Sequence, residues 1–278
     1  MQRAPKVPLN NGVEIDAVGY GVYKVPPADT TDLCTLALEA GYRTLDTATM
    51  YGNEAGVGEA VRRALAGGRK RSDIFVTTKV FNRDQGYDST LRAFDSSLDL
   101  LGLKYLDLYL IHWPLPERGL YVETYRALEQ LYRDGRVRSI GVSNFQRPHL
   151  ERLFGEAGVV PALNQIEVHP YLQQHDLRAF HAEHGIATQA WSPLGRGHVL
   201  TDPVITGIAA DLGRTPAQVI LRWHLDGGNL VIPKASSAER IQGNLDVFDF
   251  TLAPDQRAAI DGLERGHRFG SHPDRVNS

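Results

Sequence analysis

AVGYGVYKV, residues 17–25, is the stretch that separates two possible folds for this chain. A doubly wound nucleotide-binding sheet usually has a GxGxxG loop directly after its first strand, where the glycines let a pyrophosphate approach the backbone. This strand-like run is the first after a short hairpin pattern, and it contains no such loop. It therefore favours the other common arrangement of alternating strands and helices, a closed (β/α)8 TIM barrel of the α/β class.

The other strand-like runs follow at a regular spacing. The eight runs begin near Ala17, Tyr42, Ile74, Leu106, Val137, Ala162, Ala187 and Leu230. The first seven starts lie 25 to 32 residues apart, and the last gap, 43 residues, is long enough for two helices. Helical patterns fill the gaps, and one has a complete start signal, with Thr215 as N-cap, Pro216 at the first position and Gln218 at the third.

The two ends of the chain are predicted to cover the two ends of this barrel. KVPL and VEI flank Asn11-Gly12 and predict a β-hairpin, which we expect to close the bottom. We expect a C-terminal loop around Phe269, Ser271 and His272 to lie over the active site as a lid. No linker or composition break divides the chain, so we predict one domain, 1–278.

Composition excludes several classes of partner. The 30 basic and 33 acidic side chains give a net charge of −3 with no long basic run, which argues against nucleic acid and anionic membrane surfaces. No stretch reaches the roughly 18 apolar residues of a membrane helix. The single cysteine, Cys34, has no internal disulfide partner and is predicted to pack in the core. We therefore expect a cytoplasmic protein and a monomer.

Polar groups stand at the end of nearly every predicted strand, which is where barrel enzymes carry their catalytic residues. Any one of them could be a solvated loop residue, but together they converge on one face and predict an active site. These residues are Tyr23, Asp46, Lys79, His112, Ser143, Asn144, Gln165, Glu167, Trp191, Ser192 and Lys234.

Asp46 and Tyr51 lie on one connection, in LDTATMYGNE, and suit proton donation to an oxygen. A free tyrosine has a pKa of about 10 and is a weak acid at neutral pH. The Lys79 ammonium would stabilise the phenolate, and the Asp46 carboxylate would hold that lysine charged and in place. His112, from another strand, could orient a carbonyl or share the proton.

Two further stretches suit a nucleotide. SPLGRG, residues 192–197, offers backbone N–H groups and glycines that a pyrophosphate could approach. PKASSAER places Lys234 before a helix predicted to start at Ser236, with Glu239 completing a capping box. A helix N-terminus flanked by cations binds anions, although Ser236 could equally do no more than cap its helix.

Several motifs together resemble the aldo-keto reductases in order and spacing. They are GYRTLDTATMYGNE, the strand that holds Lys79, DLYLIHWP, SIGVSNF, NQIEVHP and VIPKAS. The resemblance runs essentially end to end and is nearest to the bacterial branch that contains 2,5-diketo-D-gluconate reductases. It implies an NADPH-dependent reductase of aldehydes and ketones, with Tyr51 as general acid and Asp46, Lys79 and His112 completing a tetrad.

The resemblance also implies three sets of cofactor contacts. The nicotinamide would be held by Ser143, Asn144, Gln165 and Trp191, the last by stacking on the ring. The pyrophosphate would lie along Ser192, Leu194 and Gly195. The 2′-phosphate and adenine would be surrounded by Lys234, Ser236, Arg240 and Asn244. The chain departs from the family pattern at Ala235, where a serine is usual, and at Gly243, where a glutamate is frequent; each removes one expected cofactor contact.

The substrate is predicted to be a small carbonyl compound such as a dicarbonyl or a keto-sugar acid. An aromatic-walled pocket would be formed by Tyr23, Met50, Phe81, Trp113 and Phe145. Loop lengths do not single out one substrate.

Two other functions stay open at this point. A binding or regulatory protein can use the same fold, but the complete tetrad argues against it. A metal hydrolase would usually show an H-x-H pair on an early strand, and this chain has none. We therefore predict no metal.

Overall fold

Eight parallel strands form one curled sheet in the computed structural model, which describes residues 3–276. In chain order the strands are β3 (Tyr20–Gly21), β4 (Thr44–Asp46), β5 (Phe75–Val80), β6 (Leu106–Ile111), β7 (Val137–Ser143), β8 (Leu163–Glu167), β9 (Ala187–Trp191) and β10 (Leu230–Val231). Each strand pairs with the next along the chain. A parallel bridge between Val18 and Val231 joins the first strand to the last, so the sheet closes and the predicted barrel is confirmed.

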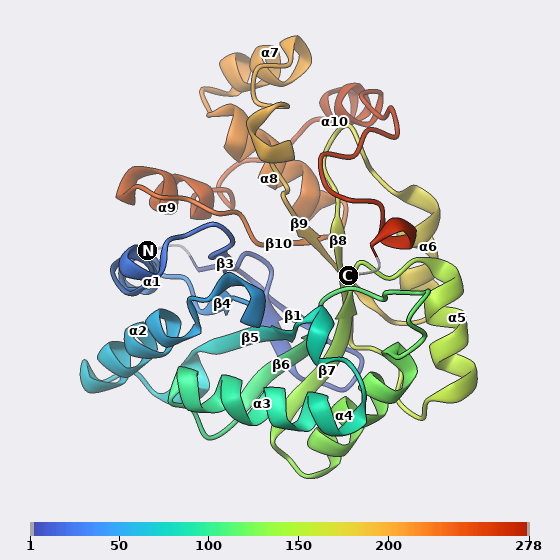
Figure 1. The fold of residues 1–278 in the computed structure, drawn as a ribbon. Helices are drawn as coiled ribbons and strands as arrows, with labels where there is room; N and C mark the ends of the chain where they lie inside the picture. The colour runs from blue at the N-terminus through green and yellow to red at the C-terminus, as the bar shows by residue number, and fades with distance from the viewer. Residues whose placement is uncertain (1–2, 277–278) are drawn as a thin grey trace.

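Helices surround the strands, as Figure 1 shows. They are α1 (Pro27–Ala40), α2 (Glu54–Ala66), α3 (Tyr87–Leu101), α4 (Tyr121–Arg133), α5 (Arg147–Glu156), α6 (His175–Glu183), α7 (Pro203–Leu212), α8 (Pro216–Asp226), α9 (Ala238–Leu245) and α10 (Pro254–Asp261). The long gap before β10 holds two helices, α7 and α8, as predicted. The capping box of α8 is also confirmed, because Thr215 Oγ1 accepts from Gln218 N and Gln218 Oε1 accepts from Thr215 N.

Helix α9 starts one residue later than predicted. Its N-cap is Ser237, whose Oγ accepts from Arg240 N at 3.4 Å, so the capping box predicted for Ser236 and Glu239 is wrong. Two adjacent serines are equally suited to capping, so the sequence alone did not decide between them.

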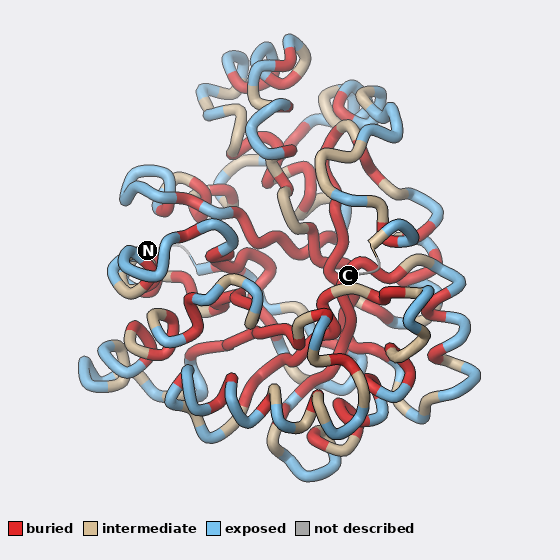
Figure 2. Tube along the Cα trace, in the orientation of Figure 1, coloured by how far each residue is buried: buried red, intermediate tan, exposed pale blue. Residues whose placement is uncertain are grey.

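The core lies between the barrel wall and the helices. Figure 2 shows the strands almost wholly buried, while the helices expose their outer faces. All six residues of β5 and of β6 are buried, as expected for strands covered on both sides. Cys34 is buried on α1, which confirms its predicted place in the core.

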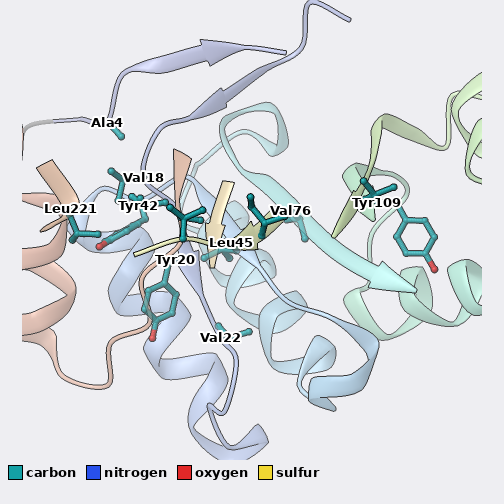
Figure 3. Close-up of a cluster of buried hydrophobic side chains, with 14 of the residues drawn as sticks. Ala4, Val18, Tyr20, Val22, Tyr42, Leu45, Val76, Tyr109 and Leu221 are labelled. Carbon is teal, nitrogen blue, oxygen red and sulfur yellow. The ribbon is translucent and has the colours of Figure 1, made fainter. Parts of the chain in front are cut away.

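Two buried tyrosines connect the first strands to the segment around α9. Tyr20 and Tyr42 pack edge to face with ring centroids 5.8 Å apart, beside Val18 and Leu45 (Figure 3). Tyr20 Oη donates to Ala235 O at 2.6 Å, and Tyr42 Oη donates to Ile241 O at 3.0 Å. These hydroxyl bonds satisfy the buried polar atoms and fix the chain that carries Lys234 and Arg240.

The N-terminal hairpin is present at the bottom of the barrel, as predicted. Strand β1 (Lys6–Pro8) pairs antiparallel with β2 (Glu14–Asp16). In the turn, Asn11 Nδ2 donates to Arg138 O at 2.9 Å, and Asn10 Nδ2 donates to Pro161 O at 3.2 Å. These carbonyls lie at the amino ends of β7 and β8, so the hairpin covers the end of the barrel opposite the predicted active site.

The small residues of α2 allow this helix to pack closely against α3. Gly58 faces α3 so closely that a methyl group on its Cα would overlap the carbonyl of Leu101. The small residues that follow Asn53 therefore let α2 approach α3, and they come directly after the connection that carries Tyr51. Within the described residues, no helix has the length and apolar character needed to span a membrane.

Candidate active site

A cavity of about 360 Å³ opens at the carboxyl ends of the strands. Thirteen of the residues predicted to form the site line it: Tyr23, Asp46, Met50, Tyr51, Phe81, His112, Trp113, Ser143, Asn144, Gln165, Trp191, Ser192 and Lys234. They come from every part of the barrel, so the fold brings together groups that lie far apart in the sequence.

Lys79 forms the base of this cavity without lining it. Its ammonium is fully buried and donates to Asp46 Oδ1 at 2.7 Å, to Thr47 O at 2.8 Å and to Tyr51 Oη at 3.5 Å. An ammonium has three donors, and these three acceptors use all of them. Asp46, Lys79 and Tyr51 therefore form one connected group, reached from the cavity through the tyrosine hydroxyl.

Tyr51 ends a short 3-10 helix, η1 (Thr49–Tyr51), that is held on both sides. Thr49 Oγ1 donates to Lys79 O at 3.0 Å. The buried side chain of Asn53 accepts from Thr47 Oγ1 at 2.7 Å and donates to the carbonyls of Val22 and Val25. The connection after β4 is therefore fixed by side-chain bonds to the two flanking strands.

The ionisation of Tyr51 is set mainly by its burial. Burial, and next the Asp46 carboxylate, raise the pKa of Tyr51 well above its usual value. The Lys79 ammonium lies 2.7 Å from Asp46 Oδ1 and 3.5 Å from Tyr51 Oη, so it is bonded more closely to the carboxylate than to the phenol. Burial also lowers the pKa of Lys79, while Asp46 opposes that shift. Tyr51 is thus a firmly protonated hydroxyl at neutral pH.

His112 lies across the cavity floor from Tyr51, with ring centroids 5.7 Å apart. Burial, and next the Lys79 ammonium, hold the pKa of His112 well below its ordinary value, so the ring is neutral. Its Nδ1 is buried and has no hydrogen-bond partner within the described chain. A neutral imidazole keeps one N–H group, which can orient a carbonyl oxygen by a hydrogen bond, but it is a much weaker acid than the charged ring.

A hydrogen-bonded wall of side chains rises beside this group. Asn144 has a left-handed backbone, with φ of 65°, and its Nδ2 donates to His112 O at 2.9 Å. Trp191 Nε1 donates to Asn144 Oδ1 at 2.8 Å, and Ser143 Oγ donates to Gln165 O at 2.8 Å. Gln165 Nε2 donates to Asp46 Oδ2 at 2.8 Å, which ties the wall to the lysine–carboxylate pair.

The residues expected at the phosphates and adenine are spread over a wider surface. Ser192 and Lys234 line the main cavity, and Lys234 also borders a second hollow of about 240 Å³ with Ser236 and residues of α1. Arg240 is exposed on α9 and Asn244 is buried one turn further along the same helix. Leu194 and Gly195 line neither hollow; Gly195 is buried close to Val199 and Phe269.

Phe145 does not line the cavity, contrary to prediction. It is fully buried, and its ring packs edge to face on Tyr121 of α4 at 5.4 Å and on His149 of α5 at 5.8 Å. The left-handed residue before it, Asn144, turns the chain at the end of β7 and directs the ring outward.

The C-terminal segment covers the cavity, as predicted; of the three residues named for it, Ser271 lines the cavity, whereas Phe269 and His272 do not. Gly270, Ser271 and Val276 line the cavity, and Figure 1 shows this segment running inward from α10. Phe269 instead stacks on His198 at 4.6 Å and packs on His169 at 4.9 Å. Glu167, predicted at the rim, is buried beneath the segment and accepts from its backbone.

Some residues that line the cavity were not predicted from the sequence. Arg196 borders the cavity with a left-handed backbone, φ of 53°, and it is the single charged residue of SPLGRG, which could have singled it out. Asn82 and Val276 carried no comparable signal. Across residues 3–276, no three His, Cys, Asp or Glu side chains gather so that they could hold a metal ion.

Comparisons with known proteins agree with this geometry. The model of the aldo/keto reductase family matches residues 17–265. An aldo-keto reductase of Mycobacterium sp. (strain KMS) is 52% identical over 274 residues, covering 99% of this chain and 98% of that protein. A morphine 6-dehydrogenase of Pseudomonas putida is 46% identical, with 99% and 97% covered. A mutant of Gox0644 crystallised in complex with NADPH is 47% identical with a TM-score of 0.94, covering 99% of both chains.

Proposed function

Because the chain belongs to the aldo/keto reductase family, we propose that it uses NADPH to reduce aldehydes and ketones to alcohols, with Tyr51 as the general acid. The observation that carries this proposal is the buried contact series Asp46–Lys79–Tyr51, which ends in a hydroxyl at the floor of the cavity. The narrower placement in the 2,5-diketo-D-gluconate reductase branch stays a prediction.

The cavity wall suits a nicotinamide. Ser143, Asn144 and Gln165 offer amide and hydroxyl groups on one side, and the Trp191 indole supplies a flat apolar surface for stacking. When bound, NADPH supplies a hydride to the carbonyl carbon. The protein supplies the proton and orients the carbonyl group.

Proton transfer follows from the contacts of Tyr51. The substrate oxygen gains negative charge as the carbon is reduced, and Tyr51 Oη gives it the proton to form the alcohol. The raised pKa of Tyr51 keeps the proton in place until that charge develops. The phenolate that remains lies 3.5 Å from the Lys79 ammonium and is stabilised there until it regains a proton from solvent. Neutral His112 orients the carbonyl oxygen from the opposite side.

The charged end of the cofactor would meet the cations at the rim. Lys234 and Arg196 border the cavity, and Arg240 lies on α9 beyond it. We propose that the pyrophosphate passes Ser192, Leu194 and Gly195, and that Lys234, Ser236, Arg240 and Asn244 surround the 2′-phosphate and adenine. Ala235 offers no hydroxyl to this phosphate because its side chain is a methyl group; the residue is buried and its carbonyl accepts from Tyr20.

The substrate class is proposed from the mouth of the cavity. Tyr23, Met50, Phe81 and Trp113 give it aromatic and apolar walls, while Ser271 of the C-terminal segment adds a hydroxyl. These walls suit a small carbonyl compound with polar substituents, such as a dicarbonyl or a keto-sugar acid. The net charge of −3 supports the absence of a nucleic-acid or anionic-membrane partner, and we further propose a cytoplasmic monomer.

The proposal is tested by NADPH oxidation, followed by absorbance, against a panel of aldehydes, dicarbonyls and keto acids. We expect turnover with at least one class, and a loss of about 10²–10⁴-fold in kcat for Tyr51→Phe. NADPH binding should change little in that variant. Tyr87→Phe, an exposed tyrosine on α3, is the matched control and should keep full activity. Near-native turnover of Tyr51→Phe would contradict the mechanism.

A further inference from the structure

The carboxylate of Glu167, at the end of β8, has no part in the proposed chemistry, although it is fully buried. Its Oε1 accepts from Phe269 N at 2.8 Å, from Gly270 N at 3.1 Å and from His169 Nε2 at 3.2 Å. Its Oε2 also accepts from Gly270 N at 3.1 Å, and Arg268 Nη1 lies 3.8 Å away. These donors offset the cost of burying the carboxylate, which would be high without partners.

These contacts join the barrel to the C-terminal segment at the point where that segment reaches the cavity. Gly270 and Ser271 line the cavity, and the two N–H groups that Glu167 accepts belong to Phe269 and Gly270. Burial alone would raise the pKa of Glu167, but the hydrogen bonds from His169, Phe269 and Gly270 outweigh it and hold the pKa below its ordinary value. The contact is therefore a charge-assisted one at neutral pH.

Gly270 in turn lies against the indole of Trp191. A methyl group on its Cα would collide with the ring, standing 3.1 Å from Cζ3, and would be 3.0 Å from Glu167 Oε2. The backbone at 270 thus fills the space between the carboxylate and the ring. The other edge of the indole is fixed by its donation to Asn144 Oδ1 at 2.8 Å. Trp191 is held on one side by Asn144 and on the other by the segment that Glu167 anchors.

We propose that Glu167 is a positioning residue, which anchors the C-terminal segment through the backbone of Phe269 and Gly270 and thereby fixes the Trp191 ring for stacking on the cofactor. We call this contact series, Glu167–Gly270–Trp191, the indole latch. It rests on the proposed function, since Trp191 is taken to stack on the nicotinamide. The latch acts on cofactor binding and leaves the proton transfer from Tyr51 unchanged, because the carboxylate of Glu167 bonds to the C-terminal segment and His169 rather than to the tetrad.

A second buried glutamate provides the matched control. Glu129 on α4 accepts from Gly158 N and Val159 N, both at 2.7 Å, so it also fixes a loop through two successive N–H groups. That loop precedes β8 and lies at the bottom end of the barrel, away from the cavity. Replacing either glutamate by glutamine removes the charge with no change in shape. At Glu167 both oxygens accept hydrogen bonds, so one of them becomes an NH2 group beside donors. At Glu129 both N–H groups donate to one oxygen, so the amide oxygen of glutamine can keep both bonds.

The experiment compares Glu167→Gln, Gly270→Ala and Glu129→Gln in a Trp113→Phe background, which leaves Trp191 as the tryptophan at the cavity. Tryptophan emission of the free protein reports on the ring directly, and a Trp191→Phe variant identifies its part of the spectrum. Calorimetric titration gives Kd for NADPH, and kinetics separate KM for NADPH from kcat. Thermal unfolding measures the stability of each variant.

We expect Glu167→Gln to shift the Trp191 emission and to raise Kd and KM for NADPH about tenfold, with little change in kcat at saturating NADPH. Gly270→Ala should do the same while leaving the charge of Glu167 in place, and the two changes together should raise Kd by less than the product of their separate effects. Glu129→Gln should lower the unfolding temperature and leave emission and Kd unchanged.

Unchanged emission and Kd in both Glu167→Gln and Gly270→Ala would overturn the latch, and so would an equal rise of Kd in Glu129→Gln. If Glu167→Gln fails to fold, Gly270→Ala decides the matter alone. A parent protein that binds no NADPH would contradict the proposed function and the cofactor half of the latch. In that case, the tryptophan emission of the variants without NADPH would still test whether Glu167 anchors the Trp191 ring.

Discussion

Asp46 and Asp107 are buried carboxylates at opposite ends of the barrel, and each contacts cations. Asp107, near the start of β6, accepts from Arg71 Nη2 at 2.7 Å, from Arg138 Nη1 at 2.9 Å and from Val76 N at 2.9 Å. Asp46, at the end of β4, accepts from Lys79 Nζ at 2.7 Å and from Gln165 Nε2 at 2.8 Å. The chemistry of the pairs is alike, but their access to water is not.

The cations of Asp107 reach it from the surface, with side chains 18% and 42% exposed, so they keep part of their hydration. Lys79 is 0% exposed, and its third contact is the hydroxyl of Tyr51. A pair whose cations remain hydrated stabilises the strands it joins. A pair sealed from water, with one donor left over for a phenol, instead orients and electrostatically supports a proton donor.

If this division holds, Lys79→Met should reduce activity far more than any substitution at the bottom of the barrel. We expect a loss of most of kcat, about 10²–10⁴-fold, because the phenolate of Tyr51 would form without its cation. The double variant with Tyr51→Phe should lose little more than either single variant, since both act in one unit. Steady-state kinetics of the two single variants and the double variant measure this coupling.

Losses that simply multiply in the double variant would show that Lys79 acts elsewhere. Arg71→Met, which removes a cation from Asp107 at the other end, is the control. It should leave kcat near that of the parent, because it bonds to Asp107 and Tyr105 at the bottom of the barrel.

Asp107→Asn should have the second largest effect, and on stability. We expect the free energy of unfolding to fall by about 2–3 kcal/mol, since two cations lose their anion and one oxygen becomes a donor. Urea unfolding measures the loss, and kcat and KM should stay unchanged. A large drop in kcat of the folded variant would mean that the two ends of the barrel do not have separate roles.

The comparison also shows why some of the site was predictable. Side chains at the ends of neighbouring parallel strands must converge, so Asp46, Lys79, His112 and Gln165 could be placed together from strand spacing alone. Tyr51 followed because it lies five residues beyond Asp46 on the same connection.

The features that could not be predicted depend on the backbone conformation of single residues and on how deeply a side chain is buried. Phe145 faces α4 and α5 because Asn144 adopts a left-handed backbone, which no pattern in the sequence marks. The pKa of Tyr51 depends on how far the phenol is buried, and a residue's spacing does not report burial. Glu167 meets a backbone about a hundred residues later, a contact that only the closed fold creates.

A third carboxylate, Asp16 at the bottom of the barrel, shows the effect of burial on the pKa of a carboxyl group. Burial raises its pKa to about 6, against opposing charges on Arg43 and Lys6. A carboxyl whose pKa rises on folding contributes stability below its unfolded value, near 3.8, and loses it as pH rises through about 6. Asp16→Asn should therefore raise the urea midpoint at about pH 8 and change it little at about pH 4.

At about pH 8 the gain from Asp16→Asn should be smaller than the loss from Asp107→Asn, because Asp107 contacts two arginines that would lose their anion. We do not expect the urea midpoints of the two variants to change by equal amounts in opposite directions. An Asp16→Asn variant that is less stable at the higher pH would show that Asp16 is paired in the same way as Asp107.

The smallest effect concerns cations that stay at the rim, outside both buried pairs. Arg240 is exposed on α9 and makes no ion pair within residues 3–276, so it is available to a 2′-phosphate beside a helix N-terminus. Charge-assisted contacts from Lys234 and Arg240 could together favour NADPH over NADH on the order of 10²-fold in kcat/KM, reduced by exposure, by salt and by the missing hydroxyl at Ala235. Arg240→Ala should lower that ratio roughly tenfold or less, mainly through KM for NADPH, and added salt should shrink the ratio in the parent more than in the variant.

Arg133→Ala, an exposed arginine at the far end of α4, is the control and should leave the ratio unchanged. An unchanged ratio in Arg240→Ala would show that Arg240 does not contact the 2′-phosphate and would leave its recognition to other residues such as Lys234.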